Sequence, residues 1–238
     1  MKKLLKFTLL FALLSTAMLV HADVTVGTIN PGAGNCYPFS CNDSGTNVGQ
    51  SIDYMQVFDA SAFSGTITVT NMEWSIAPNY IGSGLAIGGS YTFQWGYAAF
   101  GSVGALDPTP GNNYISGPNL IGTAGIPVGG INENPILQLT GFSFTYDPSL
   151  GNLLIEVIVN NQDVVPNNGS NAYNAVMNEG GVLSSRAFCL TGFGCFADNT
   201  ALVTTFSTGS TVPEPSTLVM LGSGLLGLAG LARRKFLS

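Results

Sequence analysis

The stretch FSFTYDPSLGNLLIEVIV at residues 142–159 decides the fold class of this chain. In residues 142–146, aromatic side chains alternate with Ser and Thr, which is the two-residue period of a half-buried β-strand. Residues 153–159 are apolar except for Glu156, as is typical of a central strand. The intervening DPSLGN sequence is rich in the residues that favour turns. The stretch therefore predicts a β-hairpin with a longer loop.

Other short alternating runs predict further strands, and no stretch combines a 3.6-residue apolar period with helix-capping signals. A Gly/Asn/Pro-rich segment at residues 102–134 predicts either a surface excursion or a pair of edge strands. We expect residues 23–207 to form one all-β domain, a β-sandwich or jelly roll. The additional strand-like runs are residues 24–26, 66–70, 93–97 and 202–206.

The N-terminus has the three parts of a secretory signal peptide. Three lysines stand in the first six residues, residues 9–20 are apolar, and small side chains precede Asp23. This pattern predicts a signal peptide at residues 1–22, cleaved after Ala22. An uncleaved membrane anchor is the alternative, which the shortness of the apolar run disfavours.

The C-terminus carries a second targeting pattern. Residues 208–215 form a polar linker, residues 216–232 contain no charge, and residues 233–238 form a basic tail. An uncharged run of 17 residues is close to the lower limit for a transmembrane helix. The basic residues after it are expected to hold the C-terminus in the cytoplasm. The linker ends in Pro213, Glu214 and Pro215, and the basic residues are Arg233, Arg234 and Lys235.

This three-part tail resembles the PEP-CTERM sorting signal of Gram-negative bacteria. The resemblance implies recognition by exosortase, a membrane-embedded cysteine transpeptidase, at Pro213, Glu214 and Pro215, with residues 233–235 as the stop. It also implies delivery to the cell surface or to the exopolysaccharide matrix. Residues 54–65 and 146–155 resemble blocks found in exported proteins of this group, which implies a β-sandwich domain.

The composition of residues 23–212 excludes several classes of function. This part contains 12 carboxylates, a single cation (Arg186), no lysine and no histidine, so its net charge is −11. Such a surface repels nucleic acid and anionic lipid. Without histidine, Ser-His-Asp and Cys-His nucleophilic sites are impossible. We therefore expect a protein without enzymatic activity or cofactor.

The four cysteines form two close couples, Cys36 with Cys41 and Cys189 with Cys195. An even number in an exported chain indicates disulfides. Pairing within each couple is the simplest of the three possible connectivities, and cross-pairing is the alternative. Metal binding by these cysteines is disfavoured, because the spacings exceed those of most zinc knuckles.

The remaining site hypotheses involve carboxylates, aromatic residues and calcium. Glu156 is the carboxylate of most interest because it interrupts an apolar strand, while most of the other candidate carboxylates, Glu73, Glu133, Asp163 and Glu179, are expected to be solvated. Tyr80 and Tyr114 lie in Gly/Asn/Pro contexts and are expected to be exposed, as possible glycan contacts, whereas Trp95 is expected in the core. Asn/Asp-rich loops indicate calcium weakly, because no EF-hand spacing is present.

These observations favour a surface or matrix protein associated with exopolysaccharide, or alternatively with other surface proteins. Two other hypotheses stay open. One is a carbohydrate-binding module, and the other is a glycan-active enzyme that uses a pair of carboxylates. The membrane contact would be the C-terminal helix before processing.

The signal sequence yields a direct prediction about the mature chain. Because small residues precede the expected cleavage point, exported protein should begin at Asp23. N-terminal sequencing of secreted material tests this, and retention of residues 1–22 would instead show an uncleaved anchor.

Overall fold

The computed structural model describes residues 23–28, 37–39, 51–75, 88–126, 136–160, 183–199, 201–208 and 222. The chain divides into two compact units, Ala22–Gly209 and the combined ends Met1–His21 and Ser210–Ser238. All described residues except Gly222 belong to the first unit. The expected signal peptide, the sorting motif, the membrane helix and the basic tail therefore lie outside the described residues, apart from Gly222.

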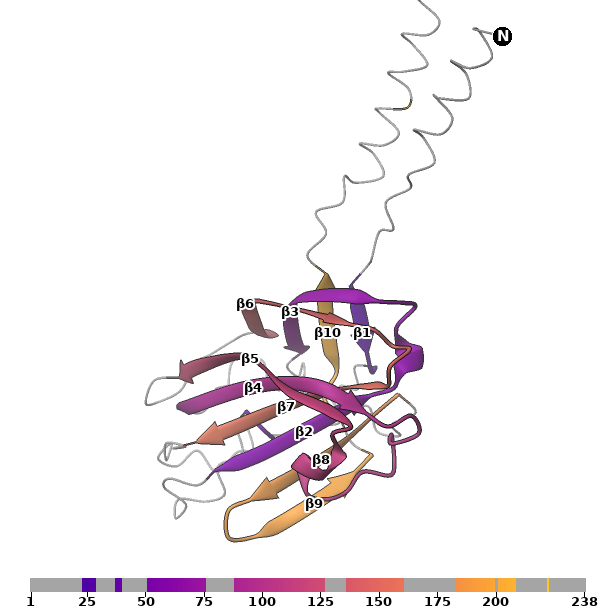
Figure 1. The fold of residues 1–238 in the computed structure, drawn as a ribbon. Helices are drawn as coiled ribbons and strands as arrows, with labels where there is room; N and C mark the ends of the chain where they lie inside the picture. The colour runs from indigo at the N-terminus through magenta and orange to yellow at the C-terminus, as the bar shows by residue number, and fades with distance from the viewer. Residues whose placement is uncertain are drawn as a thin grey trace, which may run out of the picture. The chain divides into compact units, whose positions relative to one another are not determined.

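Within the described part of the chain, ten strands form two antiparallel sheets, whose arrangement is seen in Figure 1. Short 3-10 helices at Ala60–Ala62 and Pro110–Asn113 lie in the connections. The four-stranded sheet has the order β1 (Val24–Val26), β10 (Thr204–Thr208), β3 (Ile67–Ser75) and β6 (Ile136–Tyr146). The six-stranded sheet has the order β5 (Ser116–Ile126), β4 (Gly89–Ala98), β7 (Asn152–Asn160), β2 (Ile52–Phe58), β8 (Ser184–Leu190) and β9 (Gly194–Asp198).

The pairing of eight of these strands is nested. β1 pairs with β10, β2 with β7, β3 with β6, and β4 with β5. One long hairpin that is rolled up on itself produces this order, which is the jelly-roll arrangement of two packed sheets. The all-β sandwich prediction is confirmed, and the topology is that of a jelly roll. The β8–β9 hairpin lies between β7 and β10 in sequence and extends the larger sheet beyond this frame.

The predicted hairpin at residues 142–159 is wrong in its pairing. Both strands form, but β6 pairs with β3 in one sheet and β7 pairs with β2 and β4 in the other. The turn between them is a corner of the sandwich. Tyr146 Oη donates to the carbonyl of Gly151 at 2.7 Å, and the amide of Asp147 donates to Tyr97 Oη at 3.1 Å. Local alternation specifies a strand and its buried face, but it does not specify the strand's partner.

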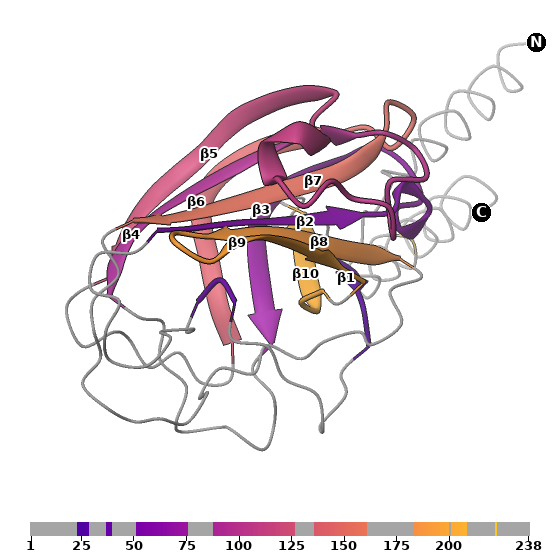
Figure 2. The same ribbon diagram turned by 90° about the horizontal axis from the view of Figure 1, so that it is seen from below.

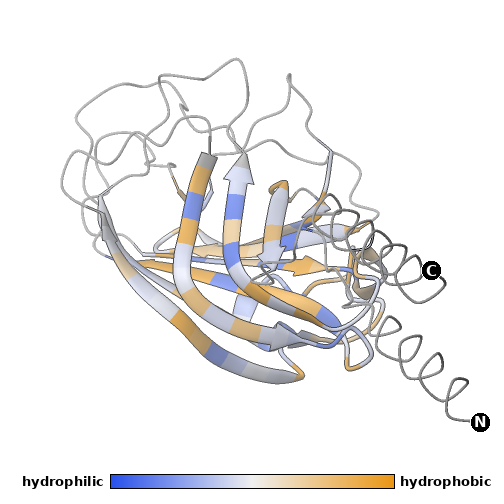
Figure 3. Cartoon of the chain, turned by 90° about the horizontal axis from the view of Figure 1, so that it is seen from above, coloured by the Kyte–Doolittle hydropathy of each residue, from blue (hydrophilic) through white to orange (hydrophobic). Residues whose placement is uncertain are grey.

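The core between the sheets is mainly aromatic. Strands of the two sheets cross at a steep angle (Figure 2), and apolar positions alternate with polar ones along them (Figure 3). Phe206 of β10 packs edge-on against Phe58 of β2, with the ring centroids 4.9 Å apart. The ring centroids of Tyr97 and Tyr146, which lie on opposite sheets, are 5.6 Å apart. Such edge-to-face and tilted contacts add to the stabilisation that burial of the rings provides.

The Gly/Asn/Pro-rich segment contains one edge strand together with a surface excursion. β5 forms the edge, and residues 99–115 cross the outer face of the larger sheet. Residues 127–135 lie outside the described residues.

The β8–β9 hairpin is fastened in three ways. A disulfide joins Cys189 to Cys195, and these residues are direct cross-strand partners. Arg186 donates from Nε and Nη2 to the two carboxylate oxygens of Asp198, each at 2.8 Å. The guanidinium also lies 4.9 Å from the centre of the Phe188 ring. Local pairing is thus confirmed for this couple, whereas Cys36 and Cys41 lie outside the described residues.

Replacing Cys189 and Cys195 together by Ser should lower the free energy of unfolding by about 2 kcal/mol, because a short closed loop removes a modest amount of entropy from the unfolded chain. Denaturant titration measures the change. The matched control is the Cys36→Ser/Cys41→Ser variant, in which reductant acts on the Cys189–Cys195 disulfide alone and should cause the same loss. Equal stability of wild type and variant would contradict a stabilising role.

Candidate functional site

Glu156 is the charged group that strand alternation places on the outer face of β7. The odd-numbered residues Leu153 to Val159 of this strand face the core between the sheets. Leu154 and Glu156 therefore face away from that core. Glu156 is nevertheless only 4% exposed. A second layer therefore covers this part of the outer face.

Residues 99–115, which we call the cover segment, form that layer. Val103, Leu106 and Tyr114 of the cover segment pack against a small apolar cluster on the outer face of the sheet. The cluster consists of Met55, Val57, Ala98 and Leu154. The larger sheet is thus buried on both faces at its centre, which explains why the apolar run of β7 continues through both alternating positions.

Several side chains fasten the cover segment. Asn113 accepts from the amide of Asp107 at 2.9 Å and donates to three carbonyls of residues 107–110. From β7, Asn152 Nδ2 donates to the carbonyl of Ala99 at 3.0 Å. The amide of Gly104 donates to Ser185 Oγ of β8 at 3.1 Å. The cover segment is therefore bonded to two strands of the sheet beneath it.

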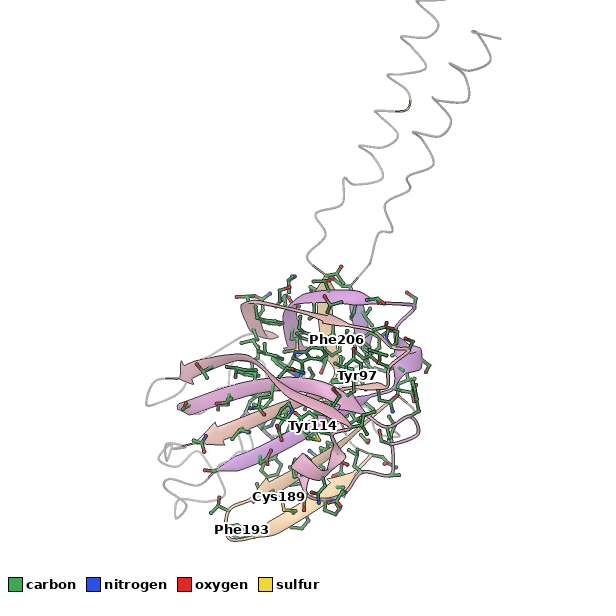
Figure 4. All side chains as sticks on the ribbon, in the orientation of Figure 1. Tyr97, Tyr114, Cys189, Phe193 and Phe206 are labelled. Carbon is green, nitrogen blue, oxygen red and sulfur yellow. A yellow bond between two sulfur atoms is a disulfide. The ribbon has the colours of Figure 1, made fainter. Side chains whose placement is uncertain are left out.

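Gly96 of β4 makes room for the Tyr114 ring. A Cβ atom at residue 96 would stand 2.6 Å from Tyr114 Cε1 and would also meet the carbonyl oxygen of Ser116. No side chain fits between the strand and the ring at such distances. The absence of a side chain at Gly96 lets the ring of Tyr114, which is labelled in Figure 4, pack against β4 while its hydroxyl reaches Glu156.

Asp53 of β2 completes a group of three titratable side chains. Tyr114 Oη donates to Glu156 Oε2 at 3.1 Å, and the carboxyl groups of Asp53 and Glu156 are hydrogen-bonded to each other. The register pairs Glu156 with Met55, so Asp53 is its diagonal neighbour on the next strand. The two carboxyl groups share one proton, because two adjacent buried carboxylates repel each other.

Burial is the main cause of the altered acidity of this group. Desolvation and the neighbouring charge of Asp53 raise the pKa of Glu156 to about 7, against the opposing hydrogen bond from Tyr114. Burial also raises the pKa of Asp53, while the hydrogen bond from Glu156 opposes that shift. Glu156 is therefore the proton donor of the pair, and Asp53 carries the charge. Burial and the charge of Glu156 raise the pKa of Tyr114 as well, so the phenol stays protonated.

This geometry does not match that of a glycosidase. Glycosidase carboxyl groups stand about 5 Å or more apart and face the substrate from opposite sides. Asp53 and Glu156 bond directly to each other, and the cover segment lies above them. Among the residues with described positions, no cluster of three or more His, Cys, Asp or Glu side chains is placed to hold a metal.

The structure places the other predicted site residues as follows. Tyr114 is half-buried and bonded to Glu156, so the expectation that it is exposed is wrong; the vacant space at Gly96 accounts for its burial. Trp95 is partly buried against the core and stacks on Phe144 at 4.7 Å. Glu73 lies on β3 of the smaller sheet, apart from Glu156, and accepts from Gln138 at 2.7 Å. Tyr80 and Ala22 lie outside the described residues.

Asp53 was missed by the sequence reasoning. Its signal in the sequence is a carboxylate within the strand-like run IDYMQVF at residues 52–58, which resembles the way Glu156 interrupts its own run. Nothing in the sequence shows that these two positions are neighbours.

The C-terminal region matches a known sorting signal. Residues 211–235 match the PEP-CTERM protein-sorting motif. The chain carries a PEP-CTERM sorting motif. This motif identifies an exported, surface-directed protein and implies exosortase as its processing partner.

No curated protein and no solved structure matches the chain. Within the described part of the chain, no helix has the length and apolar character needed to span a membrane.

The shared proton makes stability depend on pH. Folded Glu156 keeps its proton up to about pH 7, whereas the unfolded residue releases it near 4.5. The folded state binds more protons in this interval, so the free energy of unfolding should fall as pH rises through it, by about 1–3 kcal/mol. The stabilisation is complete below the unfolded pKa. Urea titrations from about pH 4 to 8.5 measure the slope.

The variant Glu156→Gln should flatten this slope, because the amide stays neutral at every pH in the range. Glu73→Gln is the matched control, since it makes the same change on the other sheet and should leave the slope intact. A slope that survives Glu156→Gln, or disappears in Glu73→Gln, would show that another group is responsible.

Proposed function

We propose that this chain is a non-enzymatic protein of the cell surface or extracellular matrix, sorted by exosortase and associated with exopolysaccharide. The observation that carries the proposal is the PEP-CTERM motif at residues 211–235. Pro213, Glu214 and Pro215 are the recognition residues in this proposal, and residues 233–235 stop the membrane helix at residues 216–232. The protein then passes through a membrane-anchored intermediate before it reaches the surface.

The described domain supports a structural role. The titratable groups that stand closest to an enzymatic arrangement, Asp53 and Glu156, are hydrogen-bonded to each other and lie under the cover segment. Their directly shared proton supports a role in packing rather than in turnover. Residues 23–212 contain no histidine or lysine, so those general bases are absent from the exported part.

The composition of the exported part also fits an extracellular life. The Cys189–Cys195 disulfide is of the kind that persists in oxidising compartments. A net charge of −11 over residues 23–212 keeps the protein soluble. Contact with an acidic polysaccharide would then require uncharged groups or bridging divalent cations.

Sorting is tested by replacing Pro213, Glu214 and Pro215 with Ala in the producing cell. We expect this variant to stay in the membrane fraction with its tail uncut, while the wild type loses the tail and appears in the matrix fraction. Gly209→Ala combined with Ser210→Ala is the matched control, because it changes the adjacent linker and spares the motif. Immunoblots of both fractions measure the processing. Normal processing of the motif variant would refute exosortase sorting.

Association with the matrix is tested by calorimetric titration of the unit Ala22–Gly209 with the host's exopolysaccharide, with and without calcium. Saturable heats are expected, and dependence on calcium would identify bridging by the cation. Saturable binding that Tyr80→Ala abolishes would favour a carbohydrate-binding module with a defined site. No binding under either condition would remove the exopolysaccharide from the proposal and leave other surface proteins as partners.

A further inference from the structure

Among the described strands, the β8–β9 hairpin has no counterpart in the smaller sheet. The nested pairing that produces the jelly roll is complete without it, and it extends the larger sheet on the side of β2. A disulfide, a two-point ion pair and the contact of Arg186 with the Phe188 ring hold this hairpin in shape. The outermost strand of the sheet is consequently a rigid, well-defined edge.

The other three sheet edges are protected against pairing with another chain. β1 has only three residues. β5 contains Pro118, which lacks an amide hydrogen, and its register shifts twice against β4. β6 contains Gly141 in a left-handed conformation and shifts register against β3. Short strands, proline and bulges are the devices by which natural sheets prevent edge-to-edge association.

β9 contains no proline and no register shift, and its left-handed residue, Gly194, lies at its first position. Its five residues pair with β8 in an unbroken register, and its first four residues are exposed. Phe196 is 47% exposed, and Phe193 in the adjoining turn is 54% exposed. Phe193 is labelled in Figure 4. Among the described residues, β9 has a strand partner on one side alone. An exposed, regular edge strand with apolar side chains is a template for pairing with a further strand.

The charge distribution favours a second copy of this chain as the partner. Residues 187–197 contain no charged side chain, although residues 23–212 carry a net charge of −11. The carboxylate at the end of the strand, Asp198, is paired with Arg186. Two strongly acidic molecules can therefore meet along this edge without placing unpaired carboxylates against each other.

A twofold axis at Phe196 would make such an edge self-complementary. Antiparallel pairing about that axis places Phe196 beside Phe196 of the second copy, and Asp198 beside Gly194 of the second copy. We infer that β9 is a dimerisation edge, along which two copies join their larger sheets into one continuous sheet. An interface of this symmetry uses the same edge on both subunits and closes at the dimer. This inference does not depend on the association with exopolysaccharide.

The test is sedimentation equilibrium of the unit Ala22–Gly209, which contains all ten strands. We expect a monomer–dimer equilibrium that strengthens as NaCl rises from about 0.02 to 0.5 M, because salt screens the repulsion between the acidic subunits. Phe196→Lys should weaken dimerisation at least tenfold, since it places like charges together at the axis. Leu120→Lys on β5 is the matched control, because Leu120 is also exposed on an edge strand, and it should leave dimerisation unchanged.

Amide hydrogen exchange of the wild-type unit keeps the inference testable if Phe196→Lys fails to fold. Protection of amides in residues 194–198 should rise with protein concentration, whereas amides of β5 should not change. A monomer at all salt concentrations would overturn the inference. So would a dimer that Leu120→Lys weakens as much as Phe196→Lys, or exchange of β9 amides that is independent of concentration.

Discussion

The rest of the structure depends on the burial of β7 on both of its faces. One face contributes Leu153 and Val157 to the aromatic core between the sheets, and the other contributes Leu154 and Glu156 to the layer beneath the cover segment. β2 and β4 flank β7, and their central parts are likewise buried on both faces. Because apolar area removed from water supplies most of the folding free energy, this three-strand centre anchors the domain.

The polar groups on the second face need hydrogen-bond partners, because burial removes them from water. Glu156 keeps its proton, bonds to Asp53 and accepts from Tyr114, which costs less than burying two separate carboxylates. Gly96 allows the Tyr114 ring to close over the pair. The same arrangement removes the pair from contact with a large substrate. The centre of the outer face of the larger sheet is thus covered, in keeping with the structural role proposed above.

The sequence predicted those features that depend on local chemistry. The apolar run at residues 153–159 correctly indicated a central strand, and the spacing of Cys189 and Cys195 correctly indicated a disulfide. The sequence did not predict which strands pair with each other across long stretches of chain. The β6–β7 segment looks like a hairpin because each strand alternates, yet both strands find their partners elsewhere. The turn-forming neighbours of Tyr114 indicate an exposed side chain, whereas the space that buries it is provided by Gly96 on β4, which is its neighbour only in the folded chain.

Site-resolved titration of the Glu156 carboxyl carbon by 13C NMR tests the closed outer face most directly. The account predicts a midpoint near the pKa of about 7 that burial and Asp53 impose. It also predicts that Gly96→Ala, which displaces the Tyr114 ring, lowers this midpoint by admitting water to the pair. A wild-type midpoint near 4.5, the ordinary value for a glutamic acid, would contradict the account. It would show that Glu156 is solvated and that the outer face is open to a ligand.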